Sequence, residues 1–520
     1  MKLGEAIPKM LVERGVDIAF GIPGVHTVEM YRGLPGSGLR HITPRHEQGA
    51  GFMADGYARA TGRVAACFII TGPGMTNIAT AMGQAFGDSI PMIVISSVNA
   101  EAHIGRGLGH LHEMKDQSAL VEGVAAWSRQ VRDAAELAAA LDDAMDLFAT
   151  ARPRPVHIQI PIDRLSMDAG NIPAPRARAE VPSAPASVVS DVAGRLNNAR
   201  APLIIAGGGA VGAGVQAVAE ALSAPVILSS NARGLLPTDH PLLAGGVPYG
   251  APQEALVAEC DVALALGAEF GDTDWSFYHS APRVFGGDLI RVDIDPAPPA
   301  NVSPTSEICA DATRFARDLL PLLNRNAPVP DLTACRAAVP DALEARIARH
   351  LPLLSALWAA EPEAIIVGDS TEPAYAGLAD CRPPGPRQWF TTATGFGTLG
   401  YGLPAAIGAK LAHPDRPAIA LAGDGGALYS LPELAAAAEA GVAVTMLIWN
   451  NDGYGEIREF MQTNQITPEG VNLSRVDFQS LAVGFGADYA RATTVAEVIA
   501  RLRHPRPQIV EIHEAEWELA

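Results

Sequence analysis

Two apolar segments separated by one helix-length segment give the strongest constraint on how this chain can fold. Residues 417–422 are apolar throughout and residues 442–449 form a second apolar run, which predicts two buried strands. Between them, residues 431–440 are rich in Ala, Leu and Glu, and Gly441 provides a natural helix stop. A strand, a helix and a strand in this order predict parallel strands joined by a right-handed crossover, with both carboxyl ends at the same sheet edge.

Polar, glycine-rich turns follow both predicted strands. Residues 423–426 are Gly-Asp-Gly-Gly and residues 450–453 are Asn-Asn-Asp-Gly, with Asn451 standing 27 positions after Asp424. Because the carboxyl ends of the strands meet, we expect these two side chains to lie close together and to offer oxygen atoms to a hard cation. The glycines allow the backbone to approach a phosphate group at the next helix amino terminus. The sequence therefore predicts a metal ion bridging a diphosphate, whereas two unrelated turns are the ordinary alternative.

Strand and helix patterns alternate along the whole chain, which favours parallel sheets covered by helices on both faces. With 520 residues the chain is too long for one hydrophobic core. A Pro/Ala-rich stretch at residues 171–185 and a Pro-punctuated, irregular stretch from 324 to 340 predict two linkers. We expect an α/β protein of three domains, at residues 1–170, 186–325 and 341–520.

Composition excludes several classes of partner. The formal net charge of −19 argues against binding to nucleic acid or to anionic membranes. The amino terminus lacks an apolar signal core and no apolar run reaches membrane-spanning length, so a cytoplasmic protein is expected. The five cysteines are scattered without a Cys-x-x-Cys pair, which predicts buried or idle thiols rather than zinc ligands or disulfides.

The middle segment contains a formal dinucleotide fingerprint. Residues 207–212 match Gly-x-Gly-x-x-Gly after an apolar strand, but the next predicted strand, 225–228, is followed by serines and not by an acid that could hold a ribose. A structural turn is therefore favoured over a nicotinamide site. Asp293 and Asp295 follow a further strand, where closing the strand is favoured over binding a nucleotide.

Residues 43–59 contain a glutamate close to the start of a helix. The helix is predicted from about Gln48, and small residues such as Gly49 and Ala50 indicate tight packing instead of a solvated surface. Glu47 therefore lies near a helix amino terminus. Taken alone, it would serve as a helix cap or a surface charge.

Together, these segments resemble the thiamine-diphosphate-dependent enzymes, especially the acetolactate synthase branch. The Gly-Asp-Gly run and the Asn-Asn pair resemble the metal and diphosphate motif of the family, and residues 43–59 resemble its catalytic-glutamate segment. Phe-Gly-Ile-Pro-Gly at 20–24, Thr-Gly-Pro-Gly-Met-Thr-Asn at 71–77 and the Gly-rich run at 395–408 match as well. The resemblance spans nearly the whole chain and is weakest in the middle.

The resemblance implies a thiamine diphosphate and Mg²⁺ site. The side chains of Asp424 and Asn451 and the carbonyl of Gly453 would hold the Mg²⁺ ion. Glu47 would share a hydrogen bond with pyrimidine N1′, favouring the imino form whose 4′-nitrogen takes the thiazolium C2 proton. Leu399 would prop the two rings of the cofactor into a V. Further cofactor contacts are implied for Pro23, Thr71, Asn77, Gly397, Gly423, Gly425, Gly426 and Tyr454.

The same resemblance implies an oligomer. In the family, the glutamate domain of one subunit faces the metal domain of another. A homodimer would then be the minimum active unit, and a homotetramer is expected.

The family begins by attacking the carbonyl of a small-molecule 2-oxo acid and releasing CO₂, and its branches differ in what captures the remaining carbon. A proton captures it in decarboxylases, and a second 2-oxo acid captures it in acetolactate synthases and other carboligases. Ser97-Val98 and residues 112–114 depart from the Gly-Gln and Phe-Gln-Glu of the synthases. Glu269 replaces the arginine of their flavin-contacting Gly-Ala-Arg-Phe. FAD and acetolactate synthesis are therefore doubtful.

Two histidines and several acids are the candidates for the substrate side. His110 and His112 could donate the proton, and structural histidines in a loop are the equal alternative. Glu113 and Glu456 would suit a substrate with a guanidinium tail, which takes bidentate carboxylate partners, although solvated surface acids remain the alternative. Val25 completes the candidate substrate residues.

Residues 106–117 and 449–457 resemble 5-guanidino-2-oxopentanoate (2-ketoarginine) decarboxylases. We therefore expect non-oxidative decarboxylation of a 2-oxo acid, with 2-ketoarginine as the leading substrate. The alternatives are acetolactate synthase or another carboligase, and a non-catalytic regulatory relative.

Overall fold

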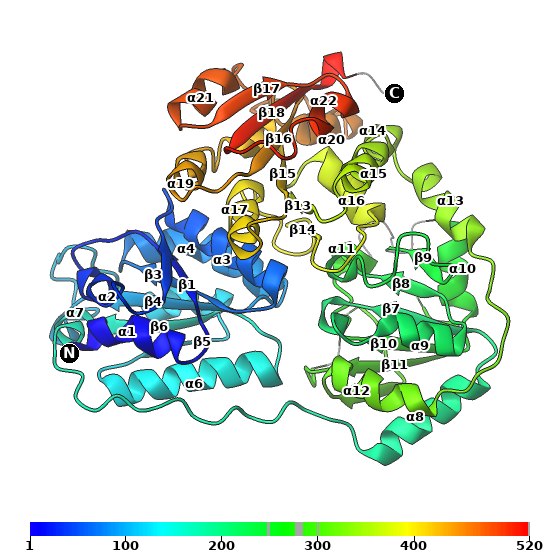
Figure 1. Cartoon of the computed structure of the whole chain (residues 1–520), viewed down its shortest axis with the longest axis horizontal. Helices are drawn as coiled ribbons and strands as arrows, with labels where there is room; N and C mark the ends of the chain where they lie inside the picture. The colour runs from blue at the N-terminus through cyan, green and yellow to red at the C-terminus, as the bar shows by residue number, and fades with distance from the viewer. Residues whose placement is uncertain (247–249, 276–283, 298, 300, 518–520) are drawn as a thin grey trace.

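The computed structural model describes residues 1–246, 250–275, 284–297, 299 and 301–517, and over these residues the chain forms three six-stranded parallel sheets. Each sheet is covered by helices (Figure 1). This confirms the expected α/β class with three parallel-sheet domains. Within the described part of the chain, no helix is both long and apolar enough to cross a bilayer.

The first sheet has the strand order β2-β1-β3-β4-β6-β5. Its inner strands β1, β3, β4 and β6 are buried over their whole length, as expected for a sheet covered on both faces. The strands are β1 (Ile18–Gly21), β2 (Arg40–Ile42), β3 (Ala65–Ile69), β4 (Met92–Val98), β5 (Trp127–Gln130) and β6 (Val156–Pro161). The helices are α1 (Leu3–Val12), α2 (Val28–Arg32), α3 (Glu47–Thr61), α4 (Pro73–Gly87), α5 (Gln117–Val121), α6 (Ala134–Thr150) and α7 (Ile162–Leu165), with short 3₁₀ turns η1 (Glu101–His103) and η2 (Glu122–Val124).

The second sheet has the order β12-β11-β10-β7-β8-β9, in which the direction of winding reverses between β10 and β7. The strands are β7 (Pro202–Ala206), β8 (Val226–Leu228), β9 (Leu243–Gly245), β10 (Val262–Leu266), β11 (Asp288–Asp293) and β12 (Ser306–Cys309). The helices are α8 (Ala186–Asn198), α9 (Val215–Leu222), α10 (Ala251–Glu259), α11 (Asp272–Trp275) and α12 (Ala312–Leu319), with 3₁₀ turns η3 (Gly208–Ala210), η4 (Ser230–Ala232) and η5 (Leu320–Leu322).

The third sheet has the order β14-β13-β15-β16-β18-β17. The strands are β13 (Ile365–Gly368), β14 (Trp389–Thr391), β15 (Ala418–Gly423), β16 (Thr445–Asn450), β17 (Asp488–Arg491) and β18 (Gln508–His513). The helices are α13 (Thr333–Ala342), α14 (Ala345–Ala348), α15 (Leu351–Ala360), α16 (Glu372–Asp380), α17 (Gly402–Ala412), α18 (Asp424–Ala427), α19 (Glu433–Glu439), α20 (Gly455–Thr463), α21 (Phe478–Gly484) and α22 (Val495–Ile499), with the 3₁₀ turn η6 (Glu514–Glu516).

The strand-helix-strand unit predicted from the sequence is confirmed. Strands β15 and β16 pair in parallel, with Gly423 beside Trp449 at their carboxyl ends. The second strand begins three residues later than its apolar run, because Gly441 adopts a left-handed φ of 64° and Val442 N–H still donates to Ala437 O at the end of α19.

The two predicted linkers behave differently. Residues 171–185 contain no helix or strand, as expected, and run as an extended segment between the first two domains (Figure 1). The prediction of irregular structure from 324 to 340 is wrong for the second half of this stretch, where α13 forms with Pro340 inside it. Buried Cys335 and Val339 anchor this helix against neighbouring elements, so packing outweighs the lost backbone donor of the proline.

Helices α3 and α17 bring the first and third domains into direct contact. An added Cβ at Gly56 would lie 2.0 Å from Ala405 O, and one at Gly408 would lie 2.0 Å from Met53 O, so only glycine permits this approach of two backbones. The α3 helix, which begins at Glu47, is therefore fixed against the third domain.

Candidate active site

Glu47 is the first residue of α3 and lies half-buried at its amino terminus, as the sequence predicts. The Nδ2 group of Asn77, on α4, donates a hydrogen bond of 2.9 Å to Glu47 Oε2. His46 caps the helix by accepting the backbone N–H of Gln48 at its Nδ1 atom. The structure thus brings together Glu47 and Asn77, two predicted cofactor residues.

Thr71 follows β3 and is fully buried. Its hydroxyl donates to Gln117 Oε1 at 2.7 Å, and its backbone N–H donates to Ser97 Oγ at 3.2 Å. Pro23 and Val25 lie in the loop after the neighbouring strand β1, and both are exposed. Gln117 was not predicted as a site residue, because only its contact across the sheet edge reveals the connection to Thr71.

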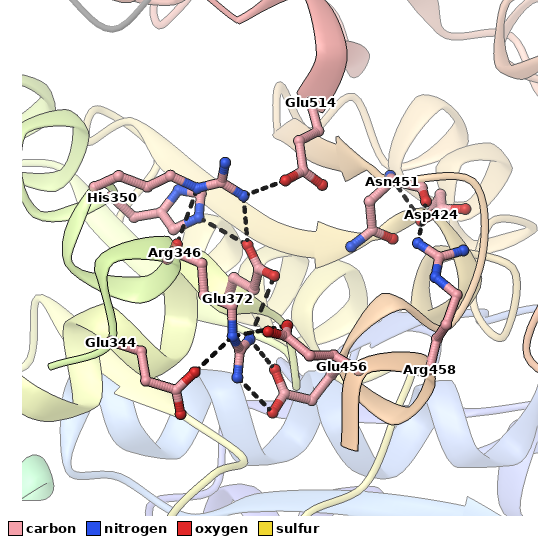
Figure 2. A network of polar contacts seen from close by, with 11 residues as sticks. Glu344, Arg346, His350, Glu372, Asp424, Asn451, Glu456, Arg458 and Glu514 are labelled. Atoms are coloured by element: carbon pink, nitrogen blue, oxygen red, sulfur yellow. Dashed lines mark hydrogen bonds and ion pairs between the residues drawn. The ribbon is translucent and has the colours of Figure 1, made fainter. Parts of the chain in front are cut away.

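Asp424 is the first residue of α18 and is only 7% exposed. Its carboxylate accepts the backbone N–H of Asn451 at 3.4 Å (Figure 2). It also accepts the backbone N–H of Gly453 at 2.7 Å. Burial raises the pKa of Asp424, although these N–H groups oppose the rise. Among the described residues no cationic side chain forms an ion pair with this carboxylate, so a bound cation would relieve its desolvation.

Glycines shape the backbone around Asp424. Gly453 has a φ of 136°, and an added Cβ there would lie 2.3 Å from Val471 O. A Cβ at Gly425 would lie 2.6 Å from Cε1 of Tyr454, so the tyrosine ring packs directly on this loop. These contacts explain why the loop requires glycine at both positions.

The loop that carries Leu399 lies against the same edge. Leu399 Cδ2 would lie 3.4 Å from a Cβ on Gly426. The buried carboxylate of Asp369, which follows β13, accepts the backbone N–H groups of Gly400 at 2.8 Å and Gly402 at 3.3 Å. Burial raises the pKa of Asp369 to about 6. Asp369 was not predicted, although an acid directly after an apolar strand run was a visible signal. Gly397, in the same loop, has a φ of 72°.

The donor set fits Mg²⁺ bound together with a diphosphate. An aspartate carboxylate, an asparagine amide and a backbone carbonyl are all hard oxygen ligands. Within the described residues, no group of three or more His, Cys, Asp or Glu side chains could hold a metal by itself. An ion at Asp424 and Asn451 therefore needs further oxygens, and a diphosphate at the glycine-rich loop would supply them.

The two candidate histidines occupy different environments. His112 has a φ of 61°, and its carbonyl oxygen would lie 2.7 Å from a Cβ on Gly72. Its ring meets that of His26 edge-on at 5.3 Å. His110 is exposed and stacks on His103 at 4.3 Å. The structure therefore places His112, and not His110, beside the loop of Thr71.

His26 is a further candidate that was not predicted. Its Nδ1 atom is buried without a hydrogen-bond partner among the described residues. Burial, and then the neighbouring His112, lower its pKa. Its position two residues after the Gly-Ile-Pro-Gly run was the only sequence signal.

The predicted substrate acids both have partners inside the chain. Glu113 accepts three backbone N–H groups of its own loop, from Gly107, Leu108 and His110, at 2.7 to 3.1 Å. Desolvation raises the pKa of Glu113, but the backbone hydrogen bonds together outweigh it and lower the pKa. Glu456 forms a bidentate pair with Arg346, at 2.6 and 3.2 Å (Figure 2).

The pair of Glu456 and Arg346 belongs to a larger ion network close to Asp424 and Asn451 (Figure 2). Arg346, on α14, also pairs with Glu372 at 3.4 Å and with Glu459 at 2.9 Å. Arg349 contacts Glu372 and Glu514. Among the described residues, the carboxylates of this network outnumber its two guanidinium groups. They are those of Glu344, Glu372, Glu456, Glu459 and Glu514.

The central domain borders a cavity of about 770 Å³ lined in part by Gly208 and Gly209. Glu269, at the position where the synthases have arginine, lies in this lining, accepts a hydrogen bond of 2.6 Å from Ser89 and pairs with Arg152 at 3.2 Å. Burial raises the pKa of Glu269. An added Cβ at Gly207 would lie 2.1 Å from a backbone oxygen of the neighbouring strand end, which agrees with a structural turn. The doubt about FAD stays a prediction.

Comparisons with known proteins agree along the chain. Three profiles of the thiamine pyrophosphate enzymes match it: the N-terminal TPP binding domain over residues 1–120, the central domain over 189–319 and the C-terminal TPP binding domain over 373–512. The chain is 44% identical over 515 residues to a probable 2-ketoarginine decarboxylase, AruI, of Pseudomonas aeruginosa, covering 96% of this chain and 91% of the relative. It is 31% identical over 540 residues to the large subunit of acetolactate synthase isozyme 1 of Escherichia coli, covering 98% and 93%. A solved thiamine diphosphate-dependent 4-hydroxybenzoylformate decarboxylase of Rhodococcus jostii RHA1 superposes with a TM-score of 0.84 at 25% identity, covering 100% of both chains.

Proposed function

The chain belongs to the thiamine pyrophosphate (thiamine diphosphate) enzyme family, and from that premise we propose that it catalyses the non-oxidative decarboxylation of 5-guanidino-2-oxopentanoate, or 2-ketoarginine. The observation that carries the proposal is its 44% identity, over nearly the whole chain, to a probable 2-ketoarginine decarboxylase. The chain also departs from the synthase pattern at Ser97-Val98, at residues 112–114 and at Glu269. A decarboxylase among the similar solved structures supports the same reaction type.

Bound thiamine diphosphate supplies the nucleophilic carbon and the electron sink that allow CO₂ to leave a 2-oxo acid. Asp424, Asn451 and the carbonyl of Gly453 would hold a Mg²⁺ ion bound together with the diphosphate. The ring of Tyr454 packs on the glycine-rich loop that would approach the phosphates.

Glu47 orients the pyrimidine ring. The amide of Asn77 holds one carboxyl oxygen, Oε2, and leaves Oε1 for the ring nitrogen N1′. Leu399 would support the cofactor from the edge that carries Asp424, on a loop that Asp369 fixes through backbone hydrogen bonds. These residues would set the geometry for removal of the C2 proton.

A decarboxylase of this kind would need a residue that donates a proton, so that an aldehyde is released. His112 is the better placed of the two predicted donors, since it lies at the loop of Thr71 and beside His26. His110 would have to reach the site from an exposed position on the same loop.

Val25, Glu113 and Glu456 receive the substrate side chain in this proposal. Because Glu456 is already paired with Arg346, a substrate guanidinium would share this carboxylate or displace the arginine. The excess of carboxylates in the surrounding network supports a cationic tail there, because each guanidinium takes bidentate partners.

We further propose a cytoplasmic homodimer at minimum, arranged as a homotetramer. The support is the family resemblance, in which the Glu47 edge of one subunit faces the Asp424 edge of another. Size-exclusion chromatography with light scattering checks this assembly, and an active monomer would contradict it.

The reaction is tested by supplying the protein, with Mg²⁺ and thiamine diphosphate, with 2-ketoarginine and with pyruvate in separate assays. Release of CO₂ from 2-ketoarginine together with the corresponding guanidino aldehyde is the expected result. Acetolactate formation from pyruvate, faster than any turnover of 2-ketoarginine, would favour the carboligase alternative, which the 31% identity to an acetolactate synthase keeps open.

A non-catalytic regulatory relative is the remaining alternative. Retention of Glu47, Asp424 and Asn451 argues against it. A ligand that binds only the native state raises the melting temperature, so no thermal shift with Mg²⁺ and thiamine diphosphate would favour the non-enzyme.

A further inference from the structure

Glu433 is a buried carboxyl group that the proposed mechanism does not use. It is 1% exposed and stands at the start of α19 in the third domain. Its carboxylate contacts the first domain. It accepts the backbone N–H of Arg45 at Oε2 and that of His46 at Oε1, each at 3.0 Å. These two N–H groups belong to the residues immediately before Glu47.

The first turn of α3 packs directly on the same carboxylate. An added Cβ at Gly49 would lie 2.2 Å from Glu433 Oε1 and 2.7 Å from its Cδ. Glu47 lies between the two points of contact, the backbone of His46 and the bare backbone of Gly49. The direction in which α3 presents Glu47 is therefore set by a side chain from the third domain.

The charged groups around Glu433 come from the residues at the start of α3. Burial raises the pKa of Glu433 to about 7. The backbone N–H groups of Arg45 and His46 and the charge of Arg45 oppose the rise, and the charge of Glu47 adds to it. The Arg45 guanidinium pairs with the exposed carboxylate of Glu439, at the other end of α19.

We propose that Glu433 is a positioning residue that holds the turn before Glu47 and so orients the Glu47 carboxyl toward the pyrimidine ring of thiamine diphosphate. The inference rests on the proposed role of Glu47. Loss of the Glu433 contacts leaves two backbone N–H groups without their acceptor and frees the helix end to shift. A small displacement of a positioned catalytic group is enough to slow proton transfer by ~10- to 100-fold.

The test is the Glu433→Gln variant, whose amide has nearly the same shape but places an NH₂ group against at least one of the backbone donors. We expect the deuterium exchange rate at C2 of bound thiamine diphosphate, followed by NMR, to fall by about tenfold or more. In the cofactor-free protein, the amide protons of Arg45 and His46 should exchange faster with solvent. The second readout does not depend on activity.

Glu439→Gln is the matched control. It removes a carboxylate from the same helix that contacts Arg45 only through the side chain. Both exchange rates should stay within about twofold of the original protein, because the backbone of the turn keeps its acceptor.

Gly49→Ala is the second variant, in case Glu433→Gln does not fold. The new methyl group pushes the Glu433 carboxylate away without removing its charge and suits a helix. Slower C2 exchange in either folded variant supports the proposal, and original rates in the folded variants overturn it. Failure of the proposed function is distinct, since the original protein would then show no catalysed C2 exchange.

Discussion

The first and third domains share one strand order but carry different residues at their candidate sites. Numbered within each domain, both sheets have the order 2-1-3-4-6-5, whereas the central sheet has the order 6-5-4-1-2-3. In both outer domains the functional residues stand at the carboxyl ends of the strands, where loops meet the following helices. Comparison of these two edges shows that the scaffold fixes where a site forms and the loop residues decide what it does.

The loops after the third strand of each outer domain make the difference plain. After β3, the buried hydroxyl of Thr71 bonds to the neutral amide of Gln117. After β15, the buried carboxylate of Asp424 meets backbone N–H groups and no cationic side chain among the described residues. The third-domain edge is thus suited to an ion and a diphosphate, while in the proposed mechanism the first-domain edge would contribute Glu47 to the pyrimidine.

The largest expected effect comes from removing the charge of the third-domain edge. Asp424→Ala should abolish the rise in melting temperature that Mg²⁺ and thiamine diphosphate produce, and should lower kcat by ~1000-fold or more, because the ion loses its carboxylate ligand. Differential scanning fluorimetry and a CO₂ assay measure these effects. The control is Asp415→Asn, an exposed acid before the opposite end of β15. A full thermal shift in Asp424→Ala would contradict the assignment of this edge.

The second effect separates activation from binding. Glu47→Gln should keep most of the cofactor-induced thermal shift, because the diphosphate edge is intact, and should lower kcat by ~100-fold or more. Unchanged turnover would remove Glu47 from the mechanism. Loss of the thermal shift together with activity would mean that Glu47 is needed for cofactor binding as well as for activation.

A smaller effect is expected at the substrate tail. Glu456→Gln should raise KM for 2-ketoarginine by about tenfold and leave KM for an uncharged 2-oxo acid of similar length nearly unchanged, since only the guanidinium needs the charge. Glu459→Gln, which also loses a contact to Arg346, is the control. Equal changes for both substrates would assign Glu456 a structural role through Arg346.

The smallest effect is a pH dependence of stability. Glu433 has a pKa of about 7 in the folded protein, against an ordinary value of 4.5. Between these values the folded state holds a proton that the unfolded state has released, so this group lowers stability as pH rises from about 4.5 to about 7. Relative to Glu433→Gln, the melting temperature of the original protein should fall by a few degrees between pH 5 and pH 8. A difference that stays constant with pH would contradict the raised pKa.

The residues that the sequence predicted are those specified by local patterns. Asp424 and Asn451 follow apolar strands joined by a short helix, and Glu47 stands where a small-residue helix begins, so strand and helix rules place all three. The role of Glu47 toward a pyrimidine came from the family resemblance, because local patterns alone leave a helix cap or a surface charge as the ordinary interpretation.

The contacts that the sequence could not predict join segments far apart in the chain. Glu433 and Arg45 are separated by 388 positions, and Arg346 and Glu456 by 110. Nothing local marks either pair, because each depends on how one segment packs against another. The helix around Pro340 was missed for the same reason, since burial and not propensity stabilises it.

The most direct test of the two-edge account is a crystal structure with Mg²⁺ and thiamine diphosphate bound. The account predicts the ion on Asp424, Asn451 and the Gly453 carbonyl, with a Glu47 carboxyl oxygen within hydrogen-bond distance of pyrimidine N1′, about 2.6 to 3.2 Å. An ion held elsewhere, or a pyrimidine ring contacting some other acid, would contradict it.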